Sequence, residues 1–461
     1  MFKKEMEELS GWGKYPKEKS TVFFPQTLSQ TKEVLTHSFR HYIARGNGKS
    51  YGDAALNYHN GILVHQKWNH FLSFHEQTGI LTCQSHVTLN DIIQTFVPKG
   101  YFLSVTPGIK FITLGGAIAN DVHGKNHYIE SSFSQTVLSF TLLVASGEII
   151  TCSKTENADI FWATFGSVGL TGIILTVTLQ LKKIETSYLS VSYQQTKNLS
   201  QTLDYFEKSL ENEYAVAWID CLSKGNQLGR SILMTANHAS IDDCKKNKKN
   251  LLSTSSKKQK NIPFTFPSFV LNGLSVRAYN ELYYRVHSFK KKELTHYEQF
   301  FYPLDALSNW NRMYGKKGFL QYQCVLPLEH SEEGLKEILE LLAHSSKLPF
   351  LAVLKRLGTQ TQSPFSFPME GYCLALDLPL KNDQIFPFLE ELDQLVLTFK
   401  GRLYLAKDSR MKPDMFHESY HEKFDVFKQI KKQLDPHGLF SSSLSRRLQI
   451  DDRVYHKEGK K

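Results

Sequence analysis

The sequence predicts a protein of the α+β class with two domains, and three observations support this prediction. Its 461 residues allow two or three domains at the usual size of about 100–200 residues each. The first 180 or so residues alternate short strands with glycine-containing turns, whereas long amphipathic segments appear only from about residue 185. No G-x-G-x-x-G pattern follows a clean first strand, so a simple doubly wound sheet is not expected.

Short strands and three helices are expected in the first domain, the third carrying Phe161 and Trp162. "STVFFP" reads as a strand ending at Pro25, and "TLSQTKEVLTHSF" as a helix with Thr27 or Ser29 near its cap. "HYIAR" is the next strand and leads into the glycine loop "GNGKSYGD". "GILVHQ" follows as a strand, "TLNDIIQTFVPKG" is a short helix, and "FLSFHEQTGILTCQ" and "SFTLLVASGEIITCS" contain hairpin-type turns.

In the second domain, helices and strands alternate. The amphipathic segments are "TKNLSQTLDYFEKSLENE", "EEGLKEILELLAHSS" and "NDQIFPFLEELDQLVLTF". The apolar strands between and beside them are "GFLQYQCVLP", "PFLAVLKRLG" and "GYCLALDLP". Residues 240–275 are first polar and then proline-rich, which is typical of a mobile insertion.

The charge balance restricts the partners. A net charge of +10 suits nucleic acid, an anionic membrane or a phosphorylated substrate. The basic runs at 245–250 and 257–260 carry little aromatic interleaving and no known reader motif, so nucleic-acid binding is not expected. A solvated basic loop is the favoured interpretation, with a polybasic contact to an anionic bilayer as the alternative.

The chain shows no sign of secretion or of a transmembrane span. Its six cysteines are scattered without C-x-x-C spacing, which suits a reducing compartment and excludes a usual zinc or redox pair. No apolar segment follows the basic N-terminus, and no apolar run reaches about 18 residues. We therefore expect a cytoplasmic protein, with peripheral contact at the inner membrane left open.

Three glycine clusters are the strongest local signal. The first contains "GKS" but has Ile43 where a triphosphate loop needs glycine, so an ordinary P-loop is not expected. Its glycines still allow the backbone to approach a phosphate closely. The second cluster, 106–127, carries a Gly-Gly pair after Thr113, and the third, 161–181, leads into a buried strand.

Together these clusters resemble the PCMH-type FAD-binding domain of the vanillyl-alcohol oxidase family. The resemblance rests on "ARGNGKSYGDAA", "TPGIKFITLGGAIANDVHGKNH", "FWATFGSVGLTGII", "FLQYQ", "LAVLKRLG" and "GRLYLAKDSR", and it extends from about Gly11 to Leu448. It implies an FAD-binding domain over 11–184 and an antiparallel sheet-and-helix substrate domain over 185–415. It also implies a C-terminal segment, 416–461, that returns to the FAD domain.

The resemblance also implies the cofactor and the residues that hold it. Many family members attach the flavin covalently through a histidine after the first G-x-G, where this chain has Lys49, so FAD is expected to bind non-covalently. The implied FAD-binding residues are Ala44, Arg45, Gly46, Asn47, Gly48, Lys49, Ser50, Tyr51, Gly52, Asp53, Ala54, Gly108, Thr113, Leu114, Gly115, Gly116, Asn120, Asp121, Val122, His123, Ile174 and Tyr404.

For catalysis, the resemblance points to Lys407, His123 and Tyr51. Lys407 is expected to stabilise negative charge at the flavin or on the developing alkoxide, the alternative being an ion pair with Asp408 or another carboxylate. His123 is expected to relay a proton, since an ordinary histidine titrates near neutral pH. The implied substrate-binding residues are Lys125, Gln321, Gln323 and Lys355.

The spacing of His123 and His127 and the position of Cys373 are interpreted as structural features. His123 and His127 have a metal-like spacing, but Gly124 lies between them and no third ligand is evident, so no metal is expected. Cys373 lies in an apolar strand, where core packing is the favoured role.

The implied activity is FAD-dependent oxidation of a secondary sugar hydroxyl. The motif set resembles family members that oxidise the 2-hydroxyl of a polyprenyl-phosphoribose, the first step of epimerisation to the arabinose form. A separate NAD(P)H-dependent short-chain reductase is then expected as a partner. The alternatives are a sugar-1,4-lactone or alditol oxidase acting on a small sugar, and an inactive flavin-fold binding protein.

Overall fold

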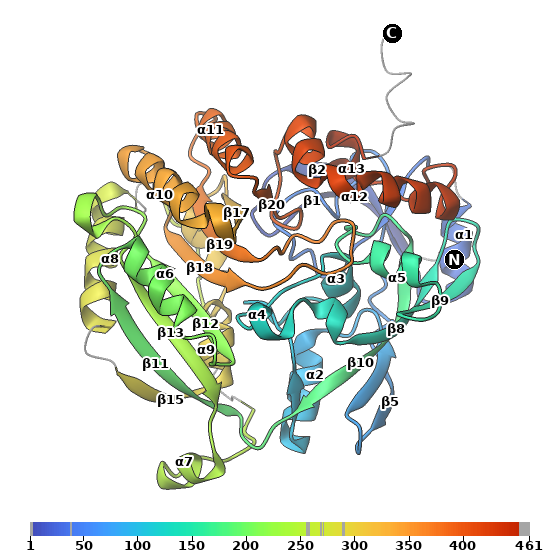
Figure 1. The fold of residues 1–461 in the computed structure, drawn as a ribbon. Helices are drawn as coiled ribbons and strands as arrows, with labels where there is room; N and C mark the ends of the chain where they lie inside the picture. The colour runs from blue at the N-terminus through green and yellow to red at the C-terminus, as the bar shows by residue number, and fades with distance from the viewer. Residues whose placement is uncertain are drawn as a thin grey trace.

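The computed structural model describes residues 3–36, 39–254, 259–267, 270, 272–287 and 291–450. Strands and helices are mixed throughout, and both large sheets are mainly antiparallel, which confirms the predicted α+β class (Figure 1). Within the described residues, the first 183 positions contain two sheets, and the largest sheet is built from residues 188–403.

The first two sheets carry the N-terminal half of the molecule. The four-stranded sheet has the order β1-β2-β4-β3, and the six-stranded sheet has the order β5-β6-β10-β8-β9 with β7 also paired to β10. Their bounds are β1 Lys3–Ser10, β2 Lys17–Phe24, β3 Tyr42–Ala44, β4 Gly61–Leu63, β5 Phe71–His75, β6 Ile80–Gln84, β7 Tyr101–Leu103, β8 Val137–Leu143, β9 Ile149–Ser153 and β10 Ile173–Lys183.

The largest sheet has eight antiparallel strands in the order β15-β11-β13-β12-β18-β19-β17-β20. Their bounds are β11 Tyr188–Thr196, β12 Tyr214–Ile219, β13 Ser231–His238, β15 Lys292–His296, β17 Phe319–Pro327, β18 Leu351–Leu357, β19 Gly371–Pro379 and β20 Arg402–Leu403. A short parallel pair, β14 Lys260–Asn261 and β16 Leu307–Ser308, lies outside these sheets.

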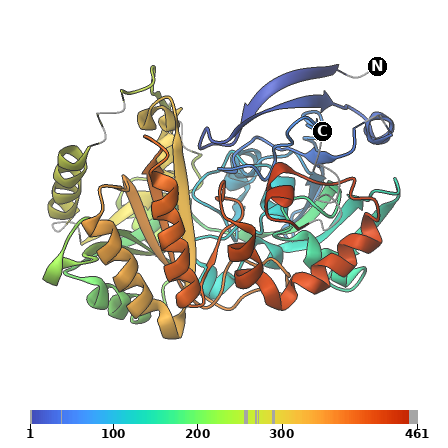
Figure 2. The same ribbon diagram turned by 90° about the horizontal axis from the view of Figure 1, so that it is seen from above.

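Helices cover the sheets. Their bounds are α1 Leu28–Leu35, α2 Leu89–Phe96, α3 Leu114–Ala119, α4 His127–Glu130, α5 Ala158–Thr164, α6 Leu199–Glu207, α7 Ile241–Lys246, α8 Gly273–His287, α9 Tyr297–Phe301, α10 Leu328–His344, α11 Ile385–Thr398, α12 Pro413–Leu434 and α13 Ser443–Arg447. Seen from above, α10 and α11 lie on the half that contains the eight-stranded sheet, whereas α12 extends over the other half (Figure 2).

Most predicted elements are present with nearby bounds. Thr27 caps α1, and Thr88 caps α2 in a capping box with Asp91. The helix expected over 196–213 is shorter, because Ser209–Asn212 form a turn before β12 begins. Residues 240–275 contain α7 and β14, and the start of α8. Part of this predicted mobile insertion, with Lys257 and Lys258 of the second basic run, lies outside the described residues.

The chain's C-terminal part contacts the N-terminal sheets directly. Tyr42 N donates to Leu439 O at 2.7 Å, and Ser441 N donates to Tyr42 O at 3.0 Å. Lys431 Nζ, at the end of α12, donates to the carbonyl of Leu170 at 2.8 Å, next to the third glycine cluster. The division that assigns 416–461 to a returning C-terminal segment stays a prediction, and residues 451–461 lie outside the described part.

Candidate active site

A cavity of about 320 Å³ lies between the two halves, which is within the range of small-molecule sites. Both halves contribute to its wall. The predicted site residues that line it are Ala44, Arg45, Gly46, Asn47, Gly48, Lys49, Ser50, Tyr51, Ala54, Gly108, Thr113, Gly115, Gly116, Asn120, Val122, His123, Ile174, Gln321, Gln323, Lys355, Tyr404 and Lys407. Sequence reasoning thus placed residues far apart in the chain around one cavity.

The other predicted site residues do not line the cavity, and their binding roles stay predictions. Leu114 is fully buried in the core. Asp121 accepts hydrogen bonds from Ser134 N and Thr361 Oγ1 at 3.1 and 3.2 Å. Lys125 Nζ donates to the carbonyl of Phe300 and lies 4.2 Å from the centre of its ring. These three support the wall from behind.

Gly52 and Asp53 also lie behind the wall, where they join the first glycine loop to a later segment. A Cβ on Gly52 would overlap the carbonyl oxygen of Asp408. Asp53 pairs with Arg447 at 2.8 Å, and Arg447 pairs with Asp408 at 2.7 Å. The glycine is required here because no side chain fits between the two segments.

The first glycine loop has little room for side chains near the cavity. A Cβ on Gly46 would overlap Thr113 Oγ1, and Gly48 has a φ of +60°. The half-buried Arg45 guanidinium donates to the carbonyls of Ser10 and Ala55 at 2.8 and 3.1 Å. Lys49 Nζ lies 3.9 Å from the ring centre of Trp12. The loop therefore presents mainly backbone to the cavity.

Lys407 is half-buried and lines the same cavity beside this loop. Its Nζ lies 4.0 Å from the centre of the Tyr51 ring. Burial lowers its pKa to about 7, the Asp377 carboxylate raises it, and Lys355 lowers it further. The ion pair considered between Lys407 and Asp408 is wrong, because Asp408 pairs with Arg447 and accepts the backbone N–H groups of Arg410 and Met411.

Lys355 faces the same cavity from β18. Burial lowers its pKa as well. Among the described residues, neither Lys355 nor Lys407 has an acidic group within ion-pair distance. Two half-buried amine groups therefore border one cavity without a paired carboxylate in the described part of the chain.

His123 provides an unpaired polar atom. Gln323 Nε2 lies 3.1 Å from His123 Nε2, and with the amide in this orientation the ring proton resides on Nδ1. That Nδ1 is buried and has no hydrogen-bond partner. Burial, followed by Lys355, His127 and Lys407, holds the pKa of His123 well below its ordinary value. The premise that His123 titrates near neutral pH is therefore wrong for this cavity.

His127 does not form a metal site with His123. Its Nδ1 accepts from Gly358 N at 3.0 Å, and its Nε2 lies 3.2 Å from Ser132 Oγ. Within the described ranges, no cluster of three or more His, Cys, Asp or Glu residues is suited to a metal ion. In the same part of the chain, no helix combines the length and apolar character needed to cross a bilayer.

Sequence reasoning missed Asp377, which supports the cavity from behind. It accepts from Gln321 Nε2 at 2.6 Å and from Tyr314 OH at 3.2 Å. Burial raises its pKa to about 6. Its sequence signal is a single carboxylate in the apolar strand "GYCLALDLP". The same strand contains Cys373, which is fully buried among apolar side chains, as predicted, and accepts from Gln323 Nε2 at 3.3 Å.

Other cavity residues were also missed, among them Leu304, Asp305 and Trp310. They lie between α9 and β17, in a segment without a glycine cluster or a repeating charge pattern. Their position depends on the pairing of β14 with β16, which joins segments separated by more than 40 residues. No local sequence signal reports such a pairing.

The comparisons with known proteins agree with this arrangement. Residues 20–153 match the model of an FAD binding domain, and residues 191–448 match that of D-arabinono-1,4-lactone oxidase. Decaprenylphosphoryl-beta-D-ribose oxidase of Mycolicibacterium smegmatis is 35% identical over 97% of this chain and 99% of its own length.

Two lactone oxidases match shorter parts of the chain. L-gulonolactone oxidase of Mus musculus is 29% identical over 43% of this chain and 47% of its own. D-arabinono-1,4-lactone oxidase of Yarrowia lipolytica is 26% identical over 35% and 32%. The chain therefore belongs to the vanillyl-alcohol oxidase-type family of decaprenylphosphoryl-beta-D-ribose oxidase, and it is an FAD-dependent oxidoreductase acting on CH–OH donors.

Proposed function

We propose that this enzyme oxidises the 2-hydroxyl of a polyprenyl-phosphoribose, the first step of epimerisation to the arabinose form. The main supporting observation is the pair of half-buried lysines, Lys355 and Lys407, whose pKa values desolvation lowers and which border the cavity without an acidic partner in the described part of the chain. A substrate phosphate would compensate this positive charge, whereas a lactone or an alditol carries no charge to do so. The full-length similarity to decaprenylphosphoryl-beta-D-ribose oxidase supports the same substrate class.

The cavity fits FAD. The glycine loop at 46–48 leaves backbone exposed to a diphosphate, and two buried atoms, His123 Nδ1 and Asn120 Oδ1, lack partners that a flavin's polar edge can supply. FAD, when bound, supplies the hydride acceptor for the carbinol carbon. The proposed FAD-holding residues are those of the first two glycine clusters that line the cavity, with Ile174 and Tyr404.

The chain's own groups supply orientation and charge. Lys407, when protonated, stabilises negative charge that develops as the substrate hydroxyl loses its proton. Gln321 donates its Nε2 to Asp377 and also interacts with the Tyr51 hydroxyl, and its carbonyl oxygen is an acceptor that a substrate hydroxyl can use. We assign Lys355 to the substrate phosphate and Tyr51 to the wall beside Lys407. We assign Lys125, whose Nζ donates to the Phe300 carbonyl, to the support of the cavity wall from behind.

The flavin is proposed to be non-covalent, because Lys49 occupies the position of the linking histidine and its ammonium lies over Trp12. Acid precipitation of the purified yellow protein tests this: the flavin is expected in the supernatant. Flavin retained by the washed, denatured pellet would contradict non-covalent binding, and the pocket histidines His65 and His86 would then be the first residues to examine.

Substrate class is tested by anaerobic mixing of the FAD-loaded enzyme with a polyprenyl-phosphoribose, a sugar-1,4-lactone and an alditol in parallel. Loss of the oxidised flavin absorbance with the phosphoribose is expected to be fastest. Faster bleaching by the lactone would favour the lactone oxidase alternative. The similarity of residues 191–448 to D-arabinono-1,4-lactone oxidase is the reason to test this substrate. No bleaching by any of the three would contradict the proposal.

The product of this step is a keto sugar, so completing the epimerisation requires a second enzyme. We propose a separate NAD(P)H-dependent short-chain reductase as partner. When such a reductase is added under turnover conditions, oxidation of NAD(P)H is expected only if both enzymes and the phosphoribose are present. NAD(P)H oxidation in the absence of this flavoenzyme would contradict the proposal that the reductase acts on its product.

A further inference from the structure

Helix α8 has the reverse of the usual polarity of a surface helix. Its outer side carries apolar side chains that are 81% exposed at Leu274, 63% at Leu282, 48% at Val286 and 44% at Tyr279. Leu274, Leu282 and Val286 are spaced by multiples of four residues, so they follow one another along one side of the helix. We call Leu274, Tyr279, Leu282 and Val286 the docking face.

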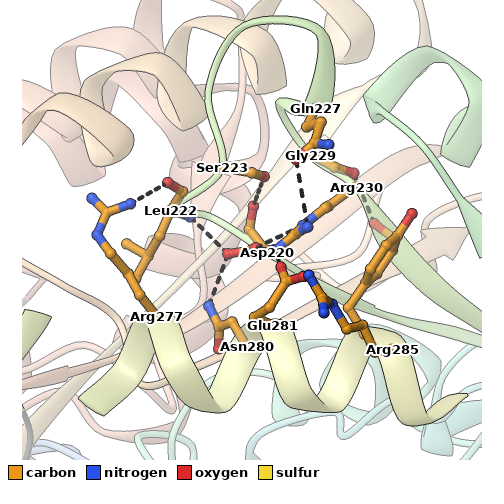
Figure 3. Close-up of polar contacts among 12 residues, drawn as sticks. Asp220, Leu222, Ser223, Gln227, Gly229, Arg230, Arg277, Asn280, Glu281 and Arg285 are labelled. Atoms are coloured by element: carbon orange, nitrogen blue, oxygen red, sulfur yellow. Dashed lines mark hydrogen bonds and ion pairs between the residues drawn. The ribbon is translucent and has the colours of Figure 1, made fainter. Parts of the chain in front are cut away.

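Polar contacts fix the inner side of α8 to the eight-stranded sheet (Figure 3). Asn280 Nδ2 donates to Asp220 Oδ1 at 2.8 Å, and Arg277 Nη1 donates to the carbonyl of Leu222 at 2.9 Å. Arg230 pairs with both Asp220 and Glu281 at 2.8 Å. These contacts hold the helix in an orientation that turns large apolar side chains outward. In most surface helices, the apolar side faces the core instead.

The docking face continues toward the cavity. The rings of Tyr279 and Phe350 lie 5.7 Å apart, and Phe350 directly precedes Leu351, which lines the cavity. Phe264, 62% exposed, lies in the segment whose β14 pairs with β16, close to the cavity residue Asp305. The exposed Tyr279 of the docking face thus contacts a half-buried aromatic side chain, Phe350, that precedes a residue lining the site that we assign to a lipid-linked sugar.

Basic side chains accompany this surface. Exposed cationic residues on α8 and immediately after it are Arg277, Arg285, Lys291 and Lys292. The acidic residues in the same stretch are Glu281 and Glu293, and Glu281 is already engaged by Arg230 and Arg285. The basic run at 245–250 lies on α7 and the turn after it, away from α8 (Figure 1). An apolar face with a basic surround is the pattern that binds anionic bilayers peripherally.

We propose that the docking face of α8 binds the surface of an anionic lipid bilayer, with its apolar side chains among the acyl chains. A polyprenyl substrate then reaches the cavity while its tail remains in the membrane. This inference rests on the proposed function for the substrate class, but membrane binding itself is measured without substrate. A second copy of this chain is the competing occupant of the same face.

Flotation with vesicles tests the proposal. The FAD-loaded enzyme is expected to float with phosphatidylcholine vesicles that contain phosphatidylglycerol and to bind pure phosphatidylcholine less. The double variant Leu274→Glu/Leu282→Glu is expected to lose about tenfold or more in partitioning, since both side chains would otherwise enter the bilayer. Val426→Glu, at a 52% exposed position on α12, is the matched control and should bind like the wild type.

Three outcomes would overturn the proposal. The first is that the wild type binds neither type of vesicle. The second is that the double variant floats to the same extent as the Val426→Glu control. The third is light scattering that shows a wild-type dimer dissociated by the double variant, because a second copy would then cover the face. Turnover of a short-chain, water-soluble phosphoribose should be equal in all three proteins, and its absence in all of them would refute the proposed function while leaving the vesicle result intact.

Discussion

Lys407 and Lys355 face one cavity from different segments, and their burial lowers the pKa of both. An ammonium group removed from water is costly unless an opposite charge compensates it. Asp377 is the carboxylate that most raises the pKa of Lys407, and it acts from behind Gln321 without forming an ion pair. The free site therefore favours an anionic ligand, and binding should return positive charge to the lysines.

The variant Lys407→Met is expected to bind FAD with affinity close to that of the wild type but to reduce it slowly with substrate. Loss of one group that stabilises developing negative charge typically slows the chemical step about 10²–10³-fold. Stopped-flow absorbance under anaerobic conditions measures this rate. Reduction as fast as in the wild type would show that Lys407 has no catalytic role.

The pH dependence should reflect the same lysine. With the pKa of Lys407 at about 7, kcat/KM is expected to fall as pH rises through this value, because only the protonated amine stabilises negative charge. A bound phosphate raises this pKa, so the fall in kcat should occur at higher pH than the fall in kcat/KM. In Lys407→Arg the alkaline fall should disappear, and its persistence there would exclude Lys407 as its origin.

Asp377 should influence that profile through Lys407 and Gln321. Asp377→Asn removes the carboxylate that raises the pKa of Lys407, so the fall in kcat/KM is expected to move to lower pH. Asp393→Asn is the matched control, because Asp393 is likewise buried and accepts from the Tyr322 hydroxyl, but pairs with Arg410. Equal shifts in both variants would mean that the effect is only structural.

Residue types were easier to predict than their partners. The glycines, Lys407 and Lys355 carry their chemistry in local motifs, so the sequence placed them at the site. Asp377 was missed because its role depends on strand register, which sets it opposite Gln321 on β17 and Leu351 on β18. The contact of Lys125 with the Phe300 carbonyl was not foreseen for a similar reason, since Phe300 lies 175 residues away.

The first glycine loop and the Lys407 turn are joined by a compact set of contacts. Tyr51 N donates to Ala406 O at 3.0 Å, Gly52 lies against Asp408, and Arg447 of α13 pairs with both Asp53 and Asp408. The side chains of both aspartates are almost completely buried. The loop proposed to hold the diphosphate and the proposed catalytic lysine therefore depend on a helix from the C-terminal end.

Replacing Arg447 by methionine should show this dependence. It leaves two buried carboxylates without their cation, which typically costs about 3–5 kcal/mol in the free energy of unfolding. Denaturant unfolding measures this loss, and FAD affinity should weaken with it. Lys412→Met, which removes an exposed pair with Glu390, is the control and should cost less than about 1 kcal/mol. Equal losses of stability in the two variants would contradict the proposed role of Arg447 in linking the glycine loop to the Lys407 turn.

Local elements were predictable because their signals are local: caps at Thr27 and Thr88, hairpin turns, and apolar strands such as "GYCLALDLP". Their order within the sheets was not. Strand β10 pairs with β6 on one side and β8 on the other, although more than 80 residues separate β6 from β10. Such pairings are selected by the packing of the complete sheet, which no segment encodes alone.

The cavity itself exists only when both halves are folded and in contact. The first half contributes the glycine loops, and the second contributes Gln321, Lys355 and Lys407. Lys431 and Tyr42 tie the C-terminal helices to the N-terminal sheets. A ligand that fills this cavity contacts both halves, so it should stabilise both against unfolding.

Calorimetry of the FAD-free protein with increasing FAD tests this coupling. We expect one unfolding transition whose midpoint rises with FAD, corresponding to about 2.7 kcal/mol of stabilisation when free FAD is 100 times its Kd. FAD bound through the N-terminal half alone would instead give two transitions, of which only one moves. That result would show that the two halves unfold independently. The contacts of the C-terminal part with the N-terminal sheets would then be too weak to couple the unfolding of the two halves.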